Sequence, residues 1–126
     1  MRAIDTNVLV RLLTRDDARQ VAAAEQFIEG GAWVSVLAVA EALWVLDSVY
    51  KRSPAGLANG VEMLLQHDRL VLQDSDAVDA ALVAFRAKPT LGFSDCLMLE
   101  LARKAGHLPL GTFDHNLSKC KGAEKL

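Results

Sequence analysis

The chain has 126 residues, of which 52% are hydrophobic and 24% are charged, and its formal net charge is −2. This is the size and composition of one globular domain, so we expect a single domain over residues 1–126. The slightly acidic net charge excludes nucleic-acid binding by bulk electrostatic attraction. Any contact with nucleic acid would need a local basic patch. All apolar runs fall well short of the roughly 20 residues that span a bilayer, so no membrane contact is expected.

The start of the chain does not read as a secretory signal. The two cysteines, Cys96 and Cys120, fit no paired motif. We therefore expect a reduced, cytoplasmic setting.

Short apolar strands alternate with helical patterns in the first half of the chain. Each predicted helix starts at a residue type that caps helices well. In chain order the predicted elements are a buried strand over residues 2–4, a helix capped by Asp5 or Thr6 and running to about Leu13, a helix capped by Asp16 or Asp17 and stopped by Gly30 and Gly31, a strand over 32–35, and a helix from Ser35 to about Tyr50. The last helix is apolar nearly all round, which predicts burial or a subunit interface for it. Trp33 and Trp44 are expected in the core or at such an interface.

The second half continues this alternation. Its predicted elements are a helix starting at Ser53 and Pro54, a strand over 69–73, a helix capped by Asp74 or Ser75 and ended by Lys88 and Pro89, a helix capped by Ser94 and running to Ala105, a strand over 108–112, and a short helix over 114–119. The last seven residues carry no clear pattern. Short apolar strands between helices are typical of an α/β layer fold with a mostly parallel sheet.

Four carboxylates stand in apolar stretches, where an ionised acid is costly unless a cation compensates it. They are Asp5 after the first strand, Glu41 inside the apolar helix, Asp95 at a helix start, and Asp114 after the last strand. Because ligands bind outside the carboxyl ends of parallel strands, we expect the four at one end of the sheet. Taken singly, the three aspartates could be helix caps, and Glu41 could pair with Arg11.

A cluster of acids without histidine or cysteine suits Mg²⁺ or Mn²⁺ better than Zn²⁺, because hard divalent cations prefer oxygen ligands. Such sites commonly cleave phosphodiester bonds. The metal generates a hydroxide nucleophile and neutralises charge on the attacked phosphate. The acids therefore indicate phosphodiester cleavage as the chemistry.

The residues around these acids resemble a known family. They are Asp5-Thr6-Asn7 directly after the first strand, Glu41 in the apolar helix, Phe93-Ser94-Asp95 opening a later helix, and Thr112-Phe113-Asp114 closing a strand. In this order, the whole chain resembles the PIN-domain ribonucleases, and more closely the VapC-type toxins of bacterial toxin–antitoxin pairs. The resemblance implies a three-layer α/β/α sandwich with a mostly parallel central sheet. It also implies a metal-dependent endoribonuclease that cuts single-stranded or looped RNA.

The resemblance assigns roles to individual residues as well. The acidic quartet that binds Mg²⁺ or Mn²⁺ is matched by Asp5, Glu41, Asp95 and Asp114. Polar positions that orient the carboxylates or metal-bound water are matched by Asn7 and Thr112. Family members are typically homodimers, and a cognate antitoxin protein blocks the site, often with a peptide segment laid across the groove.

Candidate RNA contacts are Arg11 and Arg15, four residues apart on one predicted helix, and His115 beside Asp114. Taken singly, each arginine is better explained as a solvated surface charge, and His115 is explained at least as well by a place on the surface. A few of them at the rim of the acidic site would supply salt-dependent affinity for the RNA backbone.

A phosphotransfer receiver domain is a weak alternative to a toxin nuclease. It would want adjacent acids after the first strand and a late lysine, but Asp5 stands alone and no lysine follows the Thr112 strand before Lys119. A PIN-like domain could also be a non-catalytic binding module, or an RNA-processing nuclease without an antitoxin.

Overall fold

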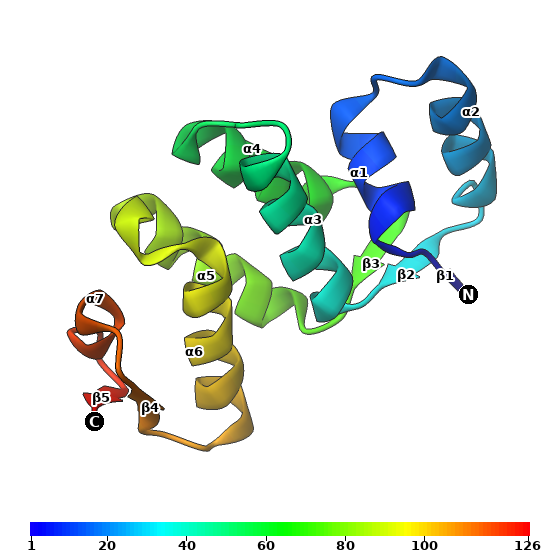
Figure 1. Ribbon diagram of the computed structural model, residues 1–126. Helices are drawn as coiled ribbons and strands as arrows, with labels where there is room; N and C mark the ends of the chain where they lie inside the picture. Colours follow the sequence, from blue (N-terminus) through cyan, green and yellow to red (C-terminus); the bar gives the residue numbers. More distant parts are fainter. The chain divides into compact units, whose positions relative to one another are not determined.

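Three short strands pair side by side in the first half of the chain. A computed structural model, which describes residues 1–126, places β1 (Arg2–Ala3), β2 (Ala32–Val34) and β3 (Leu70–Leu72) in the order β1-β2-β3 (Figure 1). Both pairings are parallel, and Trp33 of β2 is the register partner of Ala3 and of Val71. The prediction of an α/β fold with parallel strands is confirmed.

The chain divides into two compact units, Met1–Ser75 and Asp76–Leu126. The first unit holds the three-stranded sheet and four helices: α1 (Thr6–Thr14), α2 (Ala18–Phe27), α3 (Val36–Ser48) and α4 (Pro54–Gln66). The second unit holds the remaining elements: α5, which starts at the boundary (Ser75–Ala87), the short 3-10 helix η1 (Pro89–Leu91), α6 (Phe93–Ala105), β4 (Leu110–Thr112), α7 (His115–Ser118) and β5 (Ala123–Lys125).

Capping side chains fix the helix starts of the first unit. Before each of its four helices, a side-chain oxygen accepts a hydrogen bond from the backbone N–H three residues later. The capping residues are Asp5, Asp17, Ser35 and Ser53. Such a cap satisfies a donor that has no partner within the helix and stabilises the helix by roughly 1 kcal/mol. The predicted helix starts are confirmed, with Asp17 rather than Asp16 as the cap of α2.

Apolar helix faces form the core of the first unit. Helix α1 packs on α2 and α3, α3 packs on α4, and α4 packs on β3 (Figure 1). The largest fully buried side chains of the unit come from α1, β2, α3 and α4: Leu9, Val34, Val39, Leu46, Val61 and Leu64. This packing holds α1, which Asp5 precedes, against α3, which carries Glu41.

Contacts at both ends align α5 with α6 in the second unit. Phe85 and Phe93 meet edge to face, with 6.1 Å between the ring centroids. At the opposite ends of the two helices, Nζ of Lys104 lies 2.7 Å from Oδ1 of Asp76. The parallel strands β4 and β5 follow, and α7 packs on both of them.

Two free cysteines lie on the second unit. Cys96 on α6 is buried, and Cys120 after α7 is half-buried. Both line a pocket of about 320 Å³, together with Leu91, Leu99 and Arg103. Burial raises the pKa of the Cys96 thiol to about 11, with a smaller contribution from Cys120.

Some predicted boundaries are wrong for local reasons. Helix α6 begins at Phe93, after Gly92 with a φ of +80°, so Ser94 lies inside the first turn and is not the cap. Strand β1 is exposed, and only Ile4 after it enters the core. Strand β5 has no apolar pattern of its own and is defined by its pairing with β4.

Neither tryptophan lies in the core, so of the two expected places only a subunit interface stays a prediction. Trp33 is 38% exposed and Trp44 is 66% exposed. Helix α3 buries one face and leaves Leu37 and Trp44 in solvent, on the face that also carries Glu41. No helix of the structure combines the length and apolar character needed to cross a membrane.

Candidate active site

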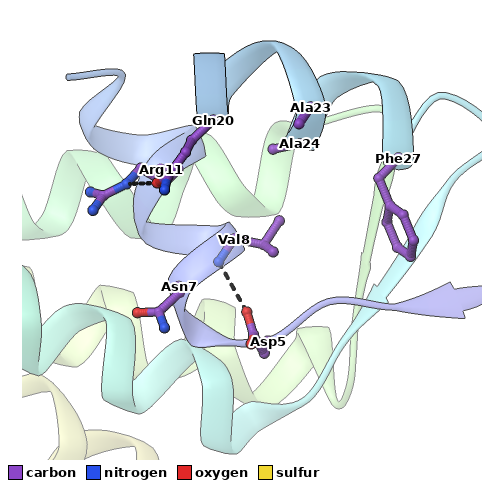
Figure 2. A pocket seen from close by; sticks show the side chains of 8 residues that line it. All are labelled: Asp5, Asn7, Val8, Arg11, Gln20, Ala23, Ala24 and Phe27. Atoms are coloured by element: carbon purple, nitrogen blue, oxygen red, sulfur yellow. Dashed lines mark hydrogen bonds between the residues drawn. The ribbon is translucent and has the colours of Figure 1, made fainter. Parts of the chain in front are cut away.

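Asp5 lies where β1 gives way to α1. Its Oδ1 accepts a hydrogen bond from the backbone N–H of Val8 at 3.1 Å, so the carboxylate caps the helix (Figure 2). The side chain is exposed, and Oδ2 makes no hydrogen bond. The capping interpretation is therefore confirmed. Because a carboxylate has several lone pairs, capping leaves oxygen sites of Asp5 for a further ligand.

Glu41 is tied to the start of α1. Its Oε2 accepts a hydrogen bond from the hydroxyl of Thr6, with 3.0 Å between the two oxygens. Thr6 directly follows Asp5, so this bond brings the second candidate acid of the first unit to the helix end that Asp5 caps. Sequence reasoning did not assign Thr6 a role in the site, although it stands in the middle of the Asp5-Thr6-Asn7 motif.

Asn7 follows in the first turn of α1. Its side chain is exposed and makes no hydrogen bond within the chain. Asn7 and Asp5 line the same pocket, of about 380 Å³, between α1 and α2 (Figure 2). Asn7 thus lies beside Asp5, and its predicted role of orienting a carboxylate or metal-bound water stays a prediction.

Asp95 and Asp114 are the candidate acids of the second unit. Asp95 lies in the first turn of α6, half-buried and without a hydrogen bond or ion pair. Burial and the nearby charge of Asp114 raise the pKa of the Asp95 carboxyl. Asp95 is thus a partly desolvated acid whose neighbouring charge is of the same sign, which is the arrangement that a cation relieves.

Asp114 is held by hydrogen bonds of both its side chain and its backbone. Its Oδ2 accepts a hydrogen bond from the backbone N–H of Leu117 at 2.7 Å and caps α7. Its own backbone N–H donates to Oγ1 of Thr112 at 3.0 Å. Thr112 therefore holds the backbone at Asp114, and its predicted role of orienting the carboxylate stays a prediction.

The expectation of costly, buried acids is wrong for three of the four. Asp5, Glu41 and Asp114 are exposed, because each sits at the end or on the outer face of an element whose apolar residues pack elsewhere. Glu41 makes no ion pair with Arg11 and is bonded by Thr6 instead. Within neither unit do three acidic, histidine or cysteine side chains gather into a metal-binding group.

A profile of the family described as PIN domain matches residues 3–123. The chain belongs to the PIN domain family. Its members are generally metal-dependent nucleases. No curated protein and no solved structure matches the chain in the other two comparisons.

The candidate acids of each unit of this PIN domain suit a hard divalent cation. In both units they are oxygen donors without histidine or cysteine, a donor type that favours Mg²⁺ or Mn²⁺ over Zn²⁺. The unpaired, half-buried carboxyl of Asp95 beside the charge of Asp114 is the observation that fits this cation most directly.

All three candidate RNA contacts have partners in this PIN domain, since Nδ1 of His115 lies 3.5 Å from Nζ of Lys125. The Arg11 guanidinium donates from Nη1 to Asp16 at 3.2 Å and to the Tyr50 hydroxyl at 3.0 Å. Arg15 pairs with Glu25 at 2.6 Å. The charges of Arg11 and Arg15 are thus partly compensated by acids of the first unit. His115 is exposed at the start of α7.

Proposed function

We propose that this PIN domain is an endoribonuclease that depends on Mg²⁺ or Mn²⁺. Its metal ligands would be the carboxylates of Asp5, Glu41, Asp95 and Asp114. The observation that carries the proposal is Asp95, a half-buried acid without hydrogen bond or ion pair, whose pKa is raised by burial and by Asp114. The family supports the reaction class, because PIN domains are generally metal-dependent nucleases.

The carboxylates would have two tasks in the proposed mechanism. Asp5, Asp95 and Asp114 would hold the principal metal, and Glu41 would hold a second metal or accept a hydrogen bond from the attacking water. The bound cation supplies charge neutralisation at the scissile phosphate and a water of lowered pKa. Thr6 positions Glu41, and Thr112 positions Asp114, through the hydrogen bonds described above. Asn7 orients a carboxylate or the water from its place beside Asp5.

The biological role in the proposal is that of a toxin in a toxin–antitoxin pair. It rests on the resemblance of the four motifs to VapC-type toxins, with single-stranded or looped RNA as substrate and a cognate antitoxin as inhibitor. A homodimer is part of the same proposal. It rests on the resemblance alone, because the exposed Leu37 and Trp44 of α3 share their helix face with the proposed ligand Glu41.

Incubation of the purified chain with defined RNAs tests the catalytic proposal. We expect cleavage with added Mg²⁺ or Mn²⁺, none in EDTA, and none in the Asp5→Asn variant with either metal. Asp47→Asn, which removes an exposed acid from the same unit, serves as the matched control and should cleave normally. Full activity of the wild type in EDTA, or of Asp5→Asn, would contradict the proposal.

Induced expression in a bacterial host tests the toxin role separately. We expect growth arrest with the wild type, none with Asp5→Asn, and relief when the protein of the neighbouring reading frame is co-expressed. RNA cleavage in vitro without growth arrest would leave a processing nuclease as the better description.

A further inference from the structure

We propose that the pocket between α1 and α2 binds one nucleobase of the RNA beside the bond that is cut. The pocket has a volume of about 380 Å³, within the range of small-ligand sites (Figure 2). It lies wholly in the first unit, and Asp5 is one of its lining residues. The inference rests on the proposed function for the identity of the polymer and adds where a base is recognised.

The ring of Phe27 is a stacking surface at one end of this pocket (Figure 2). The Arg2 guanidinium lies 3.8 Å from the ring centroid, and Nη2 of Arg2 donates to the carbonyl oxygen of Phe27 at 2.9 Å. Arg2, which is not a lining residue, therefore holds the ring in place and puts a positive charge next to it. Proteins commonly bind unpaired bases by stacking them on such aromatic rings, and a nearby cation favours an anionic polymer.

Carboxamide groups at the other end of the pocket can form hydrogen bonds with the edge of a base. Nε of Arg11 donates to Oε1 of Gln20, which fixes the side chain that closes this end (Figure 2). The amide NH₂ of Gln20 and the whole amide of Asn7 remain without hydrogen bonds. Carboxamides read base edges because they donate and accept at neighbouring atoms.

The walls between these ends are small and apolar. Val8, Ala23 and Ala24 line them, and none has a polar side-chain atom. A flat heterocycle would contact these walls and pair with the amides at the same time. An aliphatic side chain of a protein partner would leave the amides unpaired, at a cost in binding free energy. A nucleobase is therefore the occupant that the pocket favours.

Filling the pocket tests the proposal without removing any polar group. Ala23→Leu places a larger side chain in the wall, and Ala22→Leu, at the neighbouring exposed position outside the pocket, is its matched control. The probe is a fluorescently labelled single-stranded RNA of mixed sequence, bound by the full chain in EDTA and followed by anisotropy. We expect Ala23→Leu to weaken binding roughly tenfold, as the loss of one stacked base does, and Ala22→Leu to bind like the wild type.

Phe27 variants tell stacking from simple blockage. Phe27→Tyr keeps a ring and should keep the affinity, whereas Phe27→Ala should lose roughly as much as Ala23→Leu. Trp33→Ala removes an aromatic residue of similar exposure outside the pocket and should not change RNA affinity. A series of RNAs, each with one abasic site at a different position, locates the stacked base. At one position the abasic site should weaken binding by the wild type and leave the RNA affinity of Phe27→Ala unchanged. Thermal unfolding of each variant verifies that it is folded.

RNA affinity of Ala23→Leu and Phe27→Ala equal to that of the wild type would overturn the proposal. Loss of a protein partner by Ala23→Leu, with unchanged RNA affinity, would overturn it too and assign the pocket to that partner. Binding in EDTA is separate from cleavage. If the variants lose RNA binding while the wild type never cleaves RNA with Mg²⁺ or Mn²⁺, the pocket stands and the nuclease proposal fails.

Discussion

The hydroxyl of Thr6 donates a hydrogen bond to the carboxylate of Glu41, with 3.0 Å between Oγ1 and Oε2. The bond joins the first residue of α1 to the middle of α3, two helices that also pack on each other. Asp5 caps the same end of α1. Both candidate acids of the first unit are thus held at the start of α1. Thr6, the middle residue of the Asp5-Thr6-Asn7 motif, is the residue that holds Glu41 there.

Removing this hydroxyl should lower activity more than stability. We expect Thr6→Val to reduce RNA cleavage roughly tenfold, because a hydrogen bond to a charged group holds Glu41 in place. Thr6→Ser keeps the hydroxyl and should retain most of the activity. Initial rates with Mn²⁺, together with thermal unfolding, measure the two effects. An unimpaired Thr6→Val would show that Glu41 needs no such positioning.

Asp5 has two roles that different substitutions separate. Asparagine caps helices about as well as aspartate, so Asp5→Asn should change the free energy of unfolding by no more than a few tenths of a kcal/mol. Alanine cannot cap, and Asp5→Ala should cost about 1 kcal/mol. Both variants should lose metal-dependent cleavage. Urea unfolding and rate measurements side by side test this. Equal stability of the two variants would contradict the capping role.

Asp95 should be unfavourable for folding in the metal-free protein. Its pKa is raised in the folded chain, by burial and by Asp114, so the folded state binds a proton more tightly than the unfolded state. The free energy of unfolding then falls as the pH rises through the interval between the unfolded pKa, about 3.9, and the raised folded value. In EDTA at neutral pH, Asp95→Asn should therefore be more stable than the wild type, and the difference should shrink below about pH 4.

Urea denaturation at several pH values measures that difference. Asp79→Asn, an exposed acid on α5, is the matched control and should show no comparable stabilisation. Added Mn²⁺ should reverse the order, because only the wild type keeps the proposed carboxylate ligand. A metal-free Asp95→Asn less stable than the wild type at neutral pH would contradict the prediction.

Asp16 should have the opposite dependence on pH. Hydrogen bonds from the Thr14 and Tyr50 hydroxyls, and the charge of Arg11, lower its pKa in the folded chain. Its contribution to stability is present above the unfolded pKa of about 3.9 and is lost as the pH falls through the lowered folded value. We expect the stability of the wild type to decline more steeply on acidification than that of Asp16→Asn, as followed by thermal unfolding. Parallel pH profiles would contradict this.

Helix starts could be predicted because their signals are local. Asp5, Asp17, Ser35 and Ser53 cap helices through their own side chains, within three residues of the donors they satisfy. The prediction of a helix start failed where no side chain caps the helix. At α6 the turn into the helix is made by the positive φ of Gly92, and the neighbouring Ser94 suggested a cap that does not exist.

Features that depend on distant contacts could not be predicted. An apolar sequence does not show which face of α3 the rest of the fold covers, so Glu41 was expected to be buried and is exposed. Strand β5 depends on pairing with β4, and its residues 123–125 have no alternating pattern. The bond between Thr6 and Glu41 joins residues 35 positions apart, which no local motif reveals.

The unequal surroundings of the two thiols offer a route to single-site labelling. Thiol-directed dyes react with the exposed thiolate, and Cys96 is 3% exposed with a pKa of about 11. Cys120 is only half-buried, directly after the helix that Asp114 caps. A maleimide fluorophore should therefore attach at Cys120 alone, without mutagenesis. Its emission would then follow the arrival of metal or RNA near Asp114 in real time, in a protein whose own sequence is unchanged.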